Sequence, residues 1–255
     1  DTINIISEII DKIVLNQKTP IDDKITVLYE SLTKLSDQFF GATIKSVLKD
    51  VKKLDIINLS QKFTASLFGV LMTLPFISTL KHINQNRELL LKLKADFLPE
   101  SNSDGKNVVW FTDTISDLNG VSVTLRKIGW LSHAKGKKLT LVSSLTSEEI
   151  NNELPPNLHL LDHIYTFTPK DYDAYTFKFP SVLKTLKDIY EMQPDEIIIS
   201  TPGPVGLIGL LCAKLLNIKS KAIYHTDFTL EFEKILGENS PSQIIEGFMR
   251  WFYNA

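Results

Sequence analysis

The chain has 255 residues, with 28 basic and 30 acidic side chains, and 43% of its residues are hydrophobic. The near balance of charge excludes a strong overall field, so a nucleic-acid partner held by net positive charge is not expected. A single cysteine excludes an internal disulfide and is typical of a reducing compartment. We therefore expect a cytoplasmic protein of one or two domains.

Residues 1–98 are predicted to form an all-helical region of unknown role. Isoleucine and leucine recur at helical spacing in three stretches, residues 3–13, 25–35 and 44–51. A further helix is expected within residues 63–80, where Pro75 should kink or end it. That stretch holds too many hydroxyl residues for a membrane span, so we interpret it as a buried or interfacial helix. Residues 89–97 close the region.

Four lysines cluster beside apolar helical positions in this region: Lys45, Lys49, Lys52 and Lys53. Such a cluster is typical of a solvated helix face. It also suits a surface that meets anionic lipid, because cations gain energy close to such a membrane. The inner face of the membrane is therefore kept as a second candidate location, with the membrane surface as a partner.

A polar linker is predicted at residues 99–106, and from residue 107 onward strands and helices alternate. Strands are expected at 108–111, 139–142, 158–161, 164–166, 196–200 and 222–224. Helices are expected at 121–134, 146–152, 181–191, 205–216 and 240–253. This alternation predicts an α/β domain over residues 107–255, with a Rossmann-like parallel sheet and helices on both faces.

Two strands of this domain are followed by polar or special residues. The apolar run 196–200 precedes Thr201, Pro202 and Gly203, and the strand at 222–224 precedes His225 and Asp227. Because ligands of open parallel sheets bind at the carboxyl ends of strands, both groups are candidate site residues.

The first strand of the domain also ends in polar residues, Thr112 and Asp113. The loop that follows reaches Asn119, Gly120 and Val121, where a helix is expected to begin. A helix amino terminus has free N–H groups and can bind an anion. The glycine fingerprint of dinucleotide-binding folds and the phosphate loop of NTPases do not occur in the chain, and its histidines lack metal-ligand spacing. We therefore predict neither a bound cofactor nor a metal site.

Three blocks of the domain resemble the amino-terminal half of retaining glycosyltransferases of family 4. The blocks are Phe-Thr-Asp-Thr at 111–114 with Asn-Gly-Val at 119–121, Thr-Pro-Gly-Pro at 201–204, and Tyr-His-Thr-Asp-Phe at 224–228. The resemblance covers residues 106–255, and residues 1–98 take no part in it. It implies half of a GT-B fold, in which the active site lies in a cleft between two Rossmann-like halves. The implied substrates are a nucleotide-sugar donor and a sugar or lipid acceptor.

The resemblance also implies roles for single residues. His225 would be the catalytic residue that orients the donor sugar, and Asn119, Gly120 and Val121 would face the donor diphosphate. The residues of the acceptor side would be Thr112, Asp113, Thr201, Pro202, Gly203 and Asp227. The family carries its Glu-x7-Glu signature and a cationic pair in the donor half, which by this resemblance would follow residue 255. We therefore expect a fragment that lacks its donor domain and is inactive alone, since those groups stabilise the leaving phosphate.

Two other interpretations stay open. The chain could be a non-catalytic Rossmann-like binding or scaffold protein, in which residues 1–98 dock a partner. A nucleotide-sugar epimerase of similar architecture is disfavoured, because the glycine fingerprint of that class does not occur in the chain.

Overall fold

A computed structural model describes residues 20–50, 73–97, 105–168, 176–224 and 242–255, together with Asn4, Ser7, Ile10, Asp11 and Leu71. The chain divides into two compact units. One contains residues 1–79 and 181–184, and the other contains residues 80–180 and 185–255.

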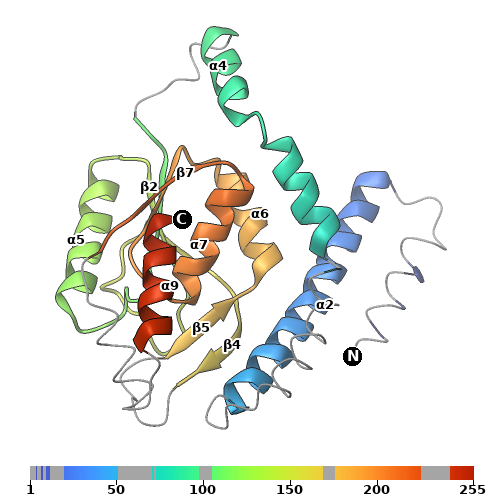
Figure 1. Cartoon of the computed structure of the whole chain (residues 1–255). Coiled ribbons are helices and arrows are strands. Elements are labelled where there is room, and N and C mark those ends of the chain that lie inside the picture. Colours follow the sequence, from blue (N-terminus) through green and yellow to red (C-terminus); the bar gives the residue numbers. More distant parts are fainter. Residues whose placement is uncertain are drawn as a thin grey trace. The chain divides into compact units, whose positions relative to one another are not determined.

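The first unit contains one long helix, α2 (Ile21–Asp50), drawn in blue in Figure 1. The sequence predicted two helices there, around 25–35 and 44–51. They are continuous because the residues between them include no proline and only one glycine, Gly41, and a single glycine costs about 1 kcal/mol. The predicted helix at 3–13 lies largely outside the described residues.

Packing within this unit centres on Tyr29 of α2. Its hydroxyl donates a hydrogen bond to the Leu183 carbonyl at 2.5 Å, and its ring meets Phe76 edge to face, with centroids 5.3 Å apart. Leu71 and residues 73–83 are helical, so Pro75 does not end the helix that was predicted around it. A proline lacks only its own N–H, so the helix loses one hydrogen bond to an earlier carbonyl, while the Pro75 carbonyl still accepts one from the Thr79 hydroxyl at 2.7 Å.

The second unit is built on a five-stranded parallel sheet with the strand order β3-β2-β1-β6-β7. The strands are β1 (Val108–Phe111), β2 (Leu139–Ser143), β3 (Leu158–Leu160), β6 (Glu196–Ile199) and β7 (Lys219–Ala222). Counted along the chain, this is the order 3-2-1-4-5 of a Rossmann half. The strand order reverses between β1 and β6, where Phe111 pairs in register with Ile199.

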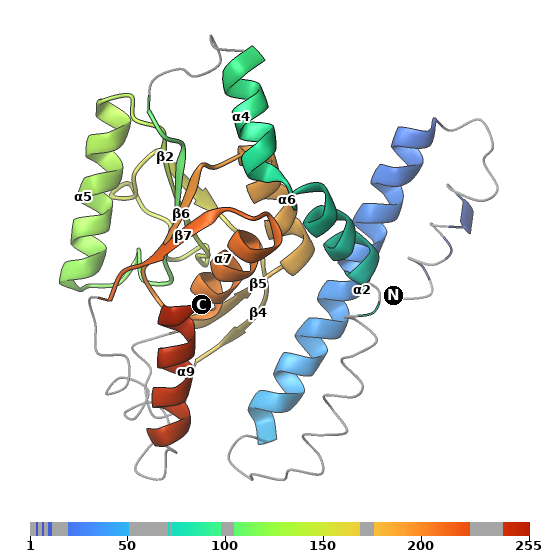
Figure 2. The same cartoon turned by 45° about the horizontal axis from the view of Figure 1, so that its top comes forward.

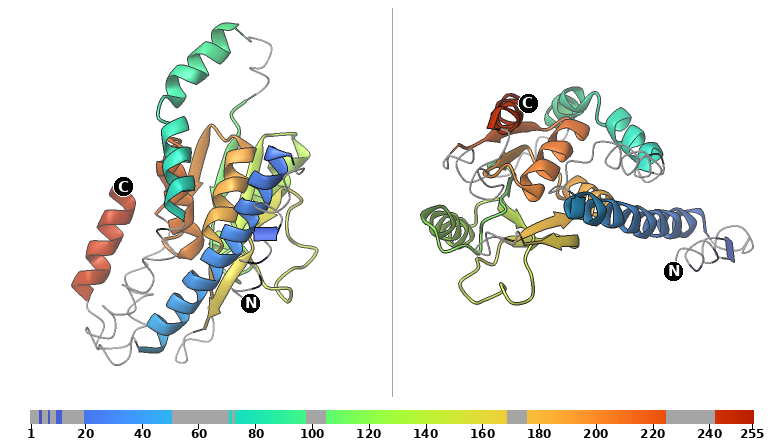
Figure 3. Two further views of the ribbon diagram at one scale, coloured as in Figure 1. Left: turned by 90° about the vertical axis from the view of Figure 1, so that its right-hand side faces the viewer. Right: turned by 60° about the horizontal axis from the view of Figure 1, so that its bottom comes forward.

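Helices cover both faces of this sheet. Helix α5 (Gly120–Ala134) connects β1 to β2, and α7 (Pro204–Leu215) connects β6 to β7. The strands separate these two helices in every view (Figures 1, 2 and 3). The unit also contains α4 (Arg87–Phe97), α9 (Ser242–Asn254) and most of α6 (Val182–Met192). The predicted α/β fold, a Rossmann-like parallel sheet with helices on both faces, is confirmed.

Helix α7 lies unusually close to the sheet. A Cβ atom added at Gly206 would sit 1.7 Å from the Thr201 carbonyl oxygen, and one added at Gly209 would sit 2.7 Å from the Phe111 ring. The helix is therefore buried on most of its surface, as its apolar sequence predicted, and Cys212 is fully buried within it. The helix ends at Leu215, just before Asn217 adopts a left-handed backbone conformation (φ 51°).

The helix predicted at 146–152 is wrong. This stretch forms turns, in which the Glu149 carboxylate accepts a hydrogen bond from the Thr146 N–H at 2.7 Å and another from the Lys178 ammonium. A bond from the Thr146 N–H to a glutamate three residues later is typical of a helix start, but only turns follow it here.

Two strand predictions also need correction. The segment predicted at 164–166 belongs to β4 (His163–Phe167), which pairs antiparallel with β5 (Phe177–Pro180) in a separate two-stranded sheet. Strand β5 was not predicted, because its sequence, Phe-Lys-Phe-Pro, contains a lysine and ends in a proline, unlike the apolar runs of β1 and β6. The last parallel strand, predicted at 222–224, is β7 at Lys219–Ala222, since its lysines lie exposed at the sheet edge beside Glu196.

Candidate functional site

Predicted site residues from two strands meet at the carboxyl edge of the sheet. Asp113 follows β1, Thr201 follows β6, and the Asp113 N–H donates a hydrogen bond to the Thr201 hydroxyl at 2.9 Å. That hydroxyl in turn donates to the Asp113 carboxylate. Thr112 is fully buried beside them, and its N–H donates to the Val142 carbonyl. The two blocks therefore form one cluster at the point where the strand order reverses, although 88 residues separate them.

Asp113 caps helix α7. Its carboxylate oxygens accept hydrogen bonds from the N–H groups of Val205 at 2.8 Å and Gly206 at 3.1 Å. The N-cap position itself is Gly203, which has no side chain to do this, and a Cβ there would lie 2.6 Å from the Asp113 carboxyl carbon. Burial raises the pKa of Asp113, while the bonds from Thr201 and the helix oppose that rise. Asp113 is 5% exposed, and its carboxylate oxygens bond groups of the protein itself.

The amino terminus of α5 is arranged differently. Asn119 is its N-cap, with extended backbone angles, and the Asn119 side-chain oxygen accepts a hydrogen bond from the Ser122 N–H at 2.8 Å. Asn119 and Gly120 are exposed, and Val121 is half-buried. Among the described residues, none accepts a hydrogen bond from the N–H groups of Gly120 and Val121. The helix dipole adds a positive partial charge there, so this terminus can receive an anion.

An ion pair that the sequence did not reveal lies near the same edge. The Lys178 side chain is 5% exposed, and its ammonium lies 2.7 Å from a Glu149 carboxylate oxygen. The Ser116 hydroxyl donates to the same oxygen at 3.1 Å. Burial alone would raise the pKa of Glu149, but the hydrogen bonds from Lys178 and Thr146 hold it below its ordinary value. The only signal in the sequence is the lysine between Phe177 and Phe179, which becomes meaningful once a strand is known there.

Asp117 lies in the loop between β1 and α5, close to this ion pair. Burial raises its pKa to about 6, the charge of Lys178 opposes the rise, and the charges of Glu149 and Asp113 add to it. The Asn119 amide lies 3.4 Å from its carboxylate. Asp117 therefore titrates near pH 6, beside the open end of α5.

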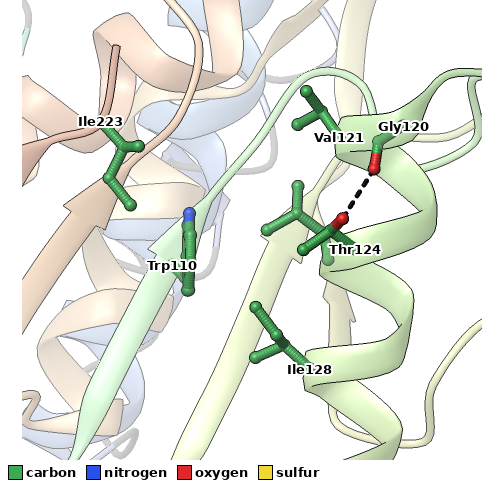
Figure 4. A pocket seen from close by; sticks show the side chains of 7 residues that line it. Trp110, Gly120, Val121, Thr124, Ile128 and Ile223 are labelled. Atoms are coloured by element: carbon green, nitrogen blue, oxygen red, sulfur yellow. Dashed lines mark hydrogen bonds between the residues drawn. The ribbon is translucent and has the colours of Figure 1, made fainter. Parts of the chain in front are cut away.

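A pocket lies between α5 and the sheet, with a volume of about 490 Å³ (Figure 4). We call it the α5 pocket. It is lined by Trp110, Gly120, Val121, Thr124, Leu125, Ile128 and Ile223. The Thr124 hydroxyl donates to the Gly120 carbonyl at 2.8 Å, and the Trp110 indole N–H donates to the Ser200 hydroxyl. Two of the predicted donor-side residues, Gly120 and Val121, thus border an apolar space.

The remaining predicted site residues stand as follows. Pro202 is buried and Gly203 half-buried between β6 and α7. His225 and Asp227 lie outside the described residues, so their roles stay predictions. Tyr224, just before them, is exposed, and its ring contacts Tyr253 of α9 with centroids 5.2 Å apart.

Comparisons with protein-family models, with curated proteins and with solved structures find no match to this chain. In the described ranges, no helix has both the length and the apolar run required to cross a bilayer. Within the same ranges, no three side chains of the His, Cys, Asp or Glu type gather closely enough to hold a metal ion.

Proposed function

We propose that the second unit is the acceptor-side half of a retaining, nucleotide-sugar-dependent glycosyltransferase with a GT-B fold. One observation carries the proposal. Two of the three blocks that resemble this enzyme family, the one at Asp113 and the one at Thr201, are hydrogen-bonded to each other at the carboxyl edge of a Rossmann-like sheet. The same edge carries the open amino terminus of α5, where an anionic ligand is favoured.

In this proposal the donor diphosphate lies against Gly120 and Val121, and the acceptor lies along the rim formed by the segments after β1 and β6. His225 orients the donor sugar. The acceptor oxygen bonds to the anomeric carbon as the bond from that carbon to the diphosphate breaks, and the leaving phosphate takes the acceptor proton. A donor half completes the cleft, and a cytoplasmic location at a membrane surface is part of the same proposal.

The substitution Gly120→Glu tests the donor side. Nothing lies within 4 Å of a Cβ atom placed at Gly120, so the fold should tolerate the change. A carboxylate there would occupy the anion site and repel a diphosphate. We expect at least about a hundredfold loss of sugar transfer, as for the removal of one group that stabilises a developing charge. Release of nucleoside diphosphate, measured on the enzyme that joins this chain to its donor half, provides the readout.

The matched control is Leu131→Glu, which places the same charge on an exposed position near the other end of α5. This variant should transfer sugar at the wild-type rate. Equal turnover by Gly120→Glu and Leu131→Glu would contradict the proposal that the amino terminus of α5 holds the diphosphate.

A second candidate function is a non-catalytic Rossmann-like binding protein. The hydrogen bonds of the site favour it, because Asp113 and Thr201 bond each other and Asp113 also caps α7. A binding protein of this kind would retain a nucleotide sugar without releasing its diphosphate when an acceptor is added. The same assay therefore separates the two candidates.

A further inference from the structure

The lining of the α5 pocket is almost entirely apolar. Trp110 and Ile223 come from the sheet side, and Leu125 and Ile128 come from the helix (Figure 4). The single hydroxyl in the lining belongs to Thr124, and it already donates to a helix carbonyl. A sugar ring or a nucleobase placed here would lose its hydrogen bonds to water without replacement, which costs free energy for each polar group. A hydrocarbon chain would lose none and would gain from burial.

One end of the pocket has a different character. Gly120 and Val121 border it there, and their N–H groups point out of the first turn of α5 without an acceptor among the described residues. The dipole of α5 places positive partial charge at the same end. Ile128, at the other end, lies eight residues further along the helix, which corresponds to about 12 Å. The pocket therefore joins an open apolar groove to a site that favours negative charge.

We propose that the α5 pocket binds a single hydrocarbon chain with an anionic head group, such as an alkyl or isoprenyl phosphate. The chain lies between Trp110 and Ile128, and the phosphate oxygens accept hydrogen bonds from the N–H groups of Gly120 and Val121. The volume of about 490 Å³ falls within the roughly 300–1,000 Å³ of small-molecule sites. This proposal goes beyond sugar transfer and does not depend on it, although a donor diphosphate would compete for the same two N–H groups.

Calorimetric titration of the chain with a graded set of ligands tests the proposal. The ligands are butyl, hexyl and octyl phosphate, octyl glucoside and inorganic pyrophosphate. We expect the Kd to fall about fourfold for each added methylene group, since each contributes the burial energy of one CH₂. Octyl phosphate should bind at least tenfold more tightly than octyl glucoside, and pyrophosphate should displace it. An affinity that is independent of chain length would overturn the hydrocarbon site, and equal binding of octyl glucoside would overturn the anionic head group.

Filling the pocket provides a second test. Ile128→Trp should weaken octyl phosphate binding at least tenfold and leave pyrophosphate binding unchanged, and Val121→Trp offers a second filling variant should the first fail to fold. Leu131→Trp makes the same change on an exposed position of the same helix and should bind octyl phosphate like the wild type. Wild-type binding of octyl phosphate by a folded filling variant would overturn the proposal.

The two proposals can fail separately. If pyrophosphate binds but the alkyl chain adds no affinity, the pocket proposal falls and the diphosphate site stands. If octyl phosphate binds with the expected dependence on chain length while Gly120→Glu still transfers sugar, the proposal that the amino terminus of α5 holds the donor diphosphate falls and the pocket proposal stands.

Discussion

Helices α5 and α7 begin at the same edge of one sheet, yet their amino termini are used in opposite ways. The first turn of α7 bonds the buried carboxylate of Asp113, which reaches it from another strand. The first turn of α5 is capped only by the neighbouring Asn119, and the N–H groups of Gly120 and Val121 open toward solvent and the α5 pocket. A helix terminus at the ligand edge of a sheet is therefore available to a ligand only where no side chain of the protein already bonds its N–H groups.

The glycines at the two termini, Gly203 and Gly120, differ in the space around them. Gly203 of α7 leaves no room for a side chain, because the Asp113 carboxyl group occupies that space. Gly120 of α5 has open space where a Cβ would be. A glycine at the first of these positions serves packing, whereas at the second it leaves the approach to the helix end open. Both proposed ligands, the donor diphosphate and the alkyl phosphate, are therefore assigned to the α5 terminus.

The largest effect on stability is expected from Asp113→Ala, which removes the cap of α7. It leaves the N–H groups of Val205 and Gly206 and the Thr201 hydroxyl without their buried acceptor. We expect a loss of about 3 kcal/mol in the free energy of unfolding, which would lower Tm by about 9 °C in a chain of this size. Thermal denaturation followed by circular dichroism measures it.

Asp113→Asn is the control for this prediction, because it keeps the shape of the side chain and one acceptor oxygen. It should fall between the wild type and Asp113→Ala. A Tm for Asp113→Ala within a degree or so of the wild type would show that the bonds from Asp113 to α7 do not stabilise the fold.

Neighbouring residues in the sequence predicted where both helices begin, but not the distant residue that caps α7. Asn119 and Gly120 adjoin the helix that they begin, and Pro204 marks the start of α7, so a few neighbouring residues sufficed for both helix boundaries. The cap of α7 comes from Asp113, about 90 residues earlier, and only the strand order brings the two together. The Lys178–Glu149 pair was missed for a similar reason, since it joins residues 29 positions apart and depends on β5, whose sequence Phe-Lys-Phe-Pro lacks the apolar run of the predicted strands.

A smaller effect is expected from Asn119→Ala, which removes the cap of the open terminus. It removes one part-buried side-chain bond to the Ser122 N–H. Loss of such a cap costs about 1 kcal/mol, or about 3 °C in Tm. Asn119→Ser, which keeps a capping oxygen, should stay close to the wild type. If Asn119→Ala destabilised the protein as much as Asp113→Ala, the two termini would not differ in the way described here.

The smallest effect is expected from Asp117→Asn, beside the open terminus, and it should depend on pH. The pKa of Asp117 is about 6 in the folded protein, above its ordinary value of 3.8, because burial and the charges of Glu149 and Asp113 outweigh the charge of Lys178. Between these two values the folded state holds the proton more firmly than the unfolded state, so the free energy of unfolding falls as pH rises through this window. The asparagine cannot ionise and escapes that loss. Asp117 is only half-buried, so solvent screening leaves a fraction of the difference between the two pKa values as stability. The variant should therefore match the wild type near pH 3.5 and exceed its Tm by about 2 °C at pH 7. A Tm difference that stays constant across this range would mean that Asp117 ionises as readily in the fold as in the unfolded chain.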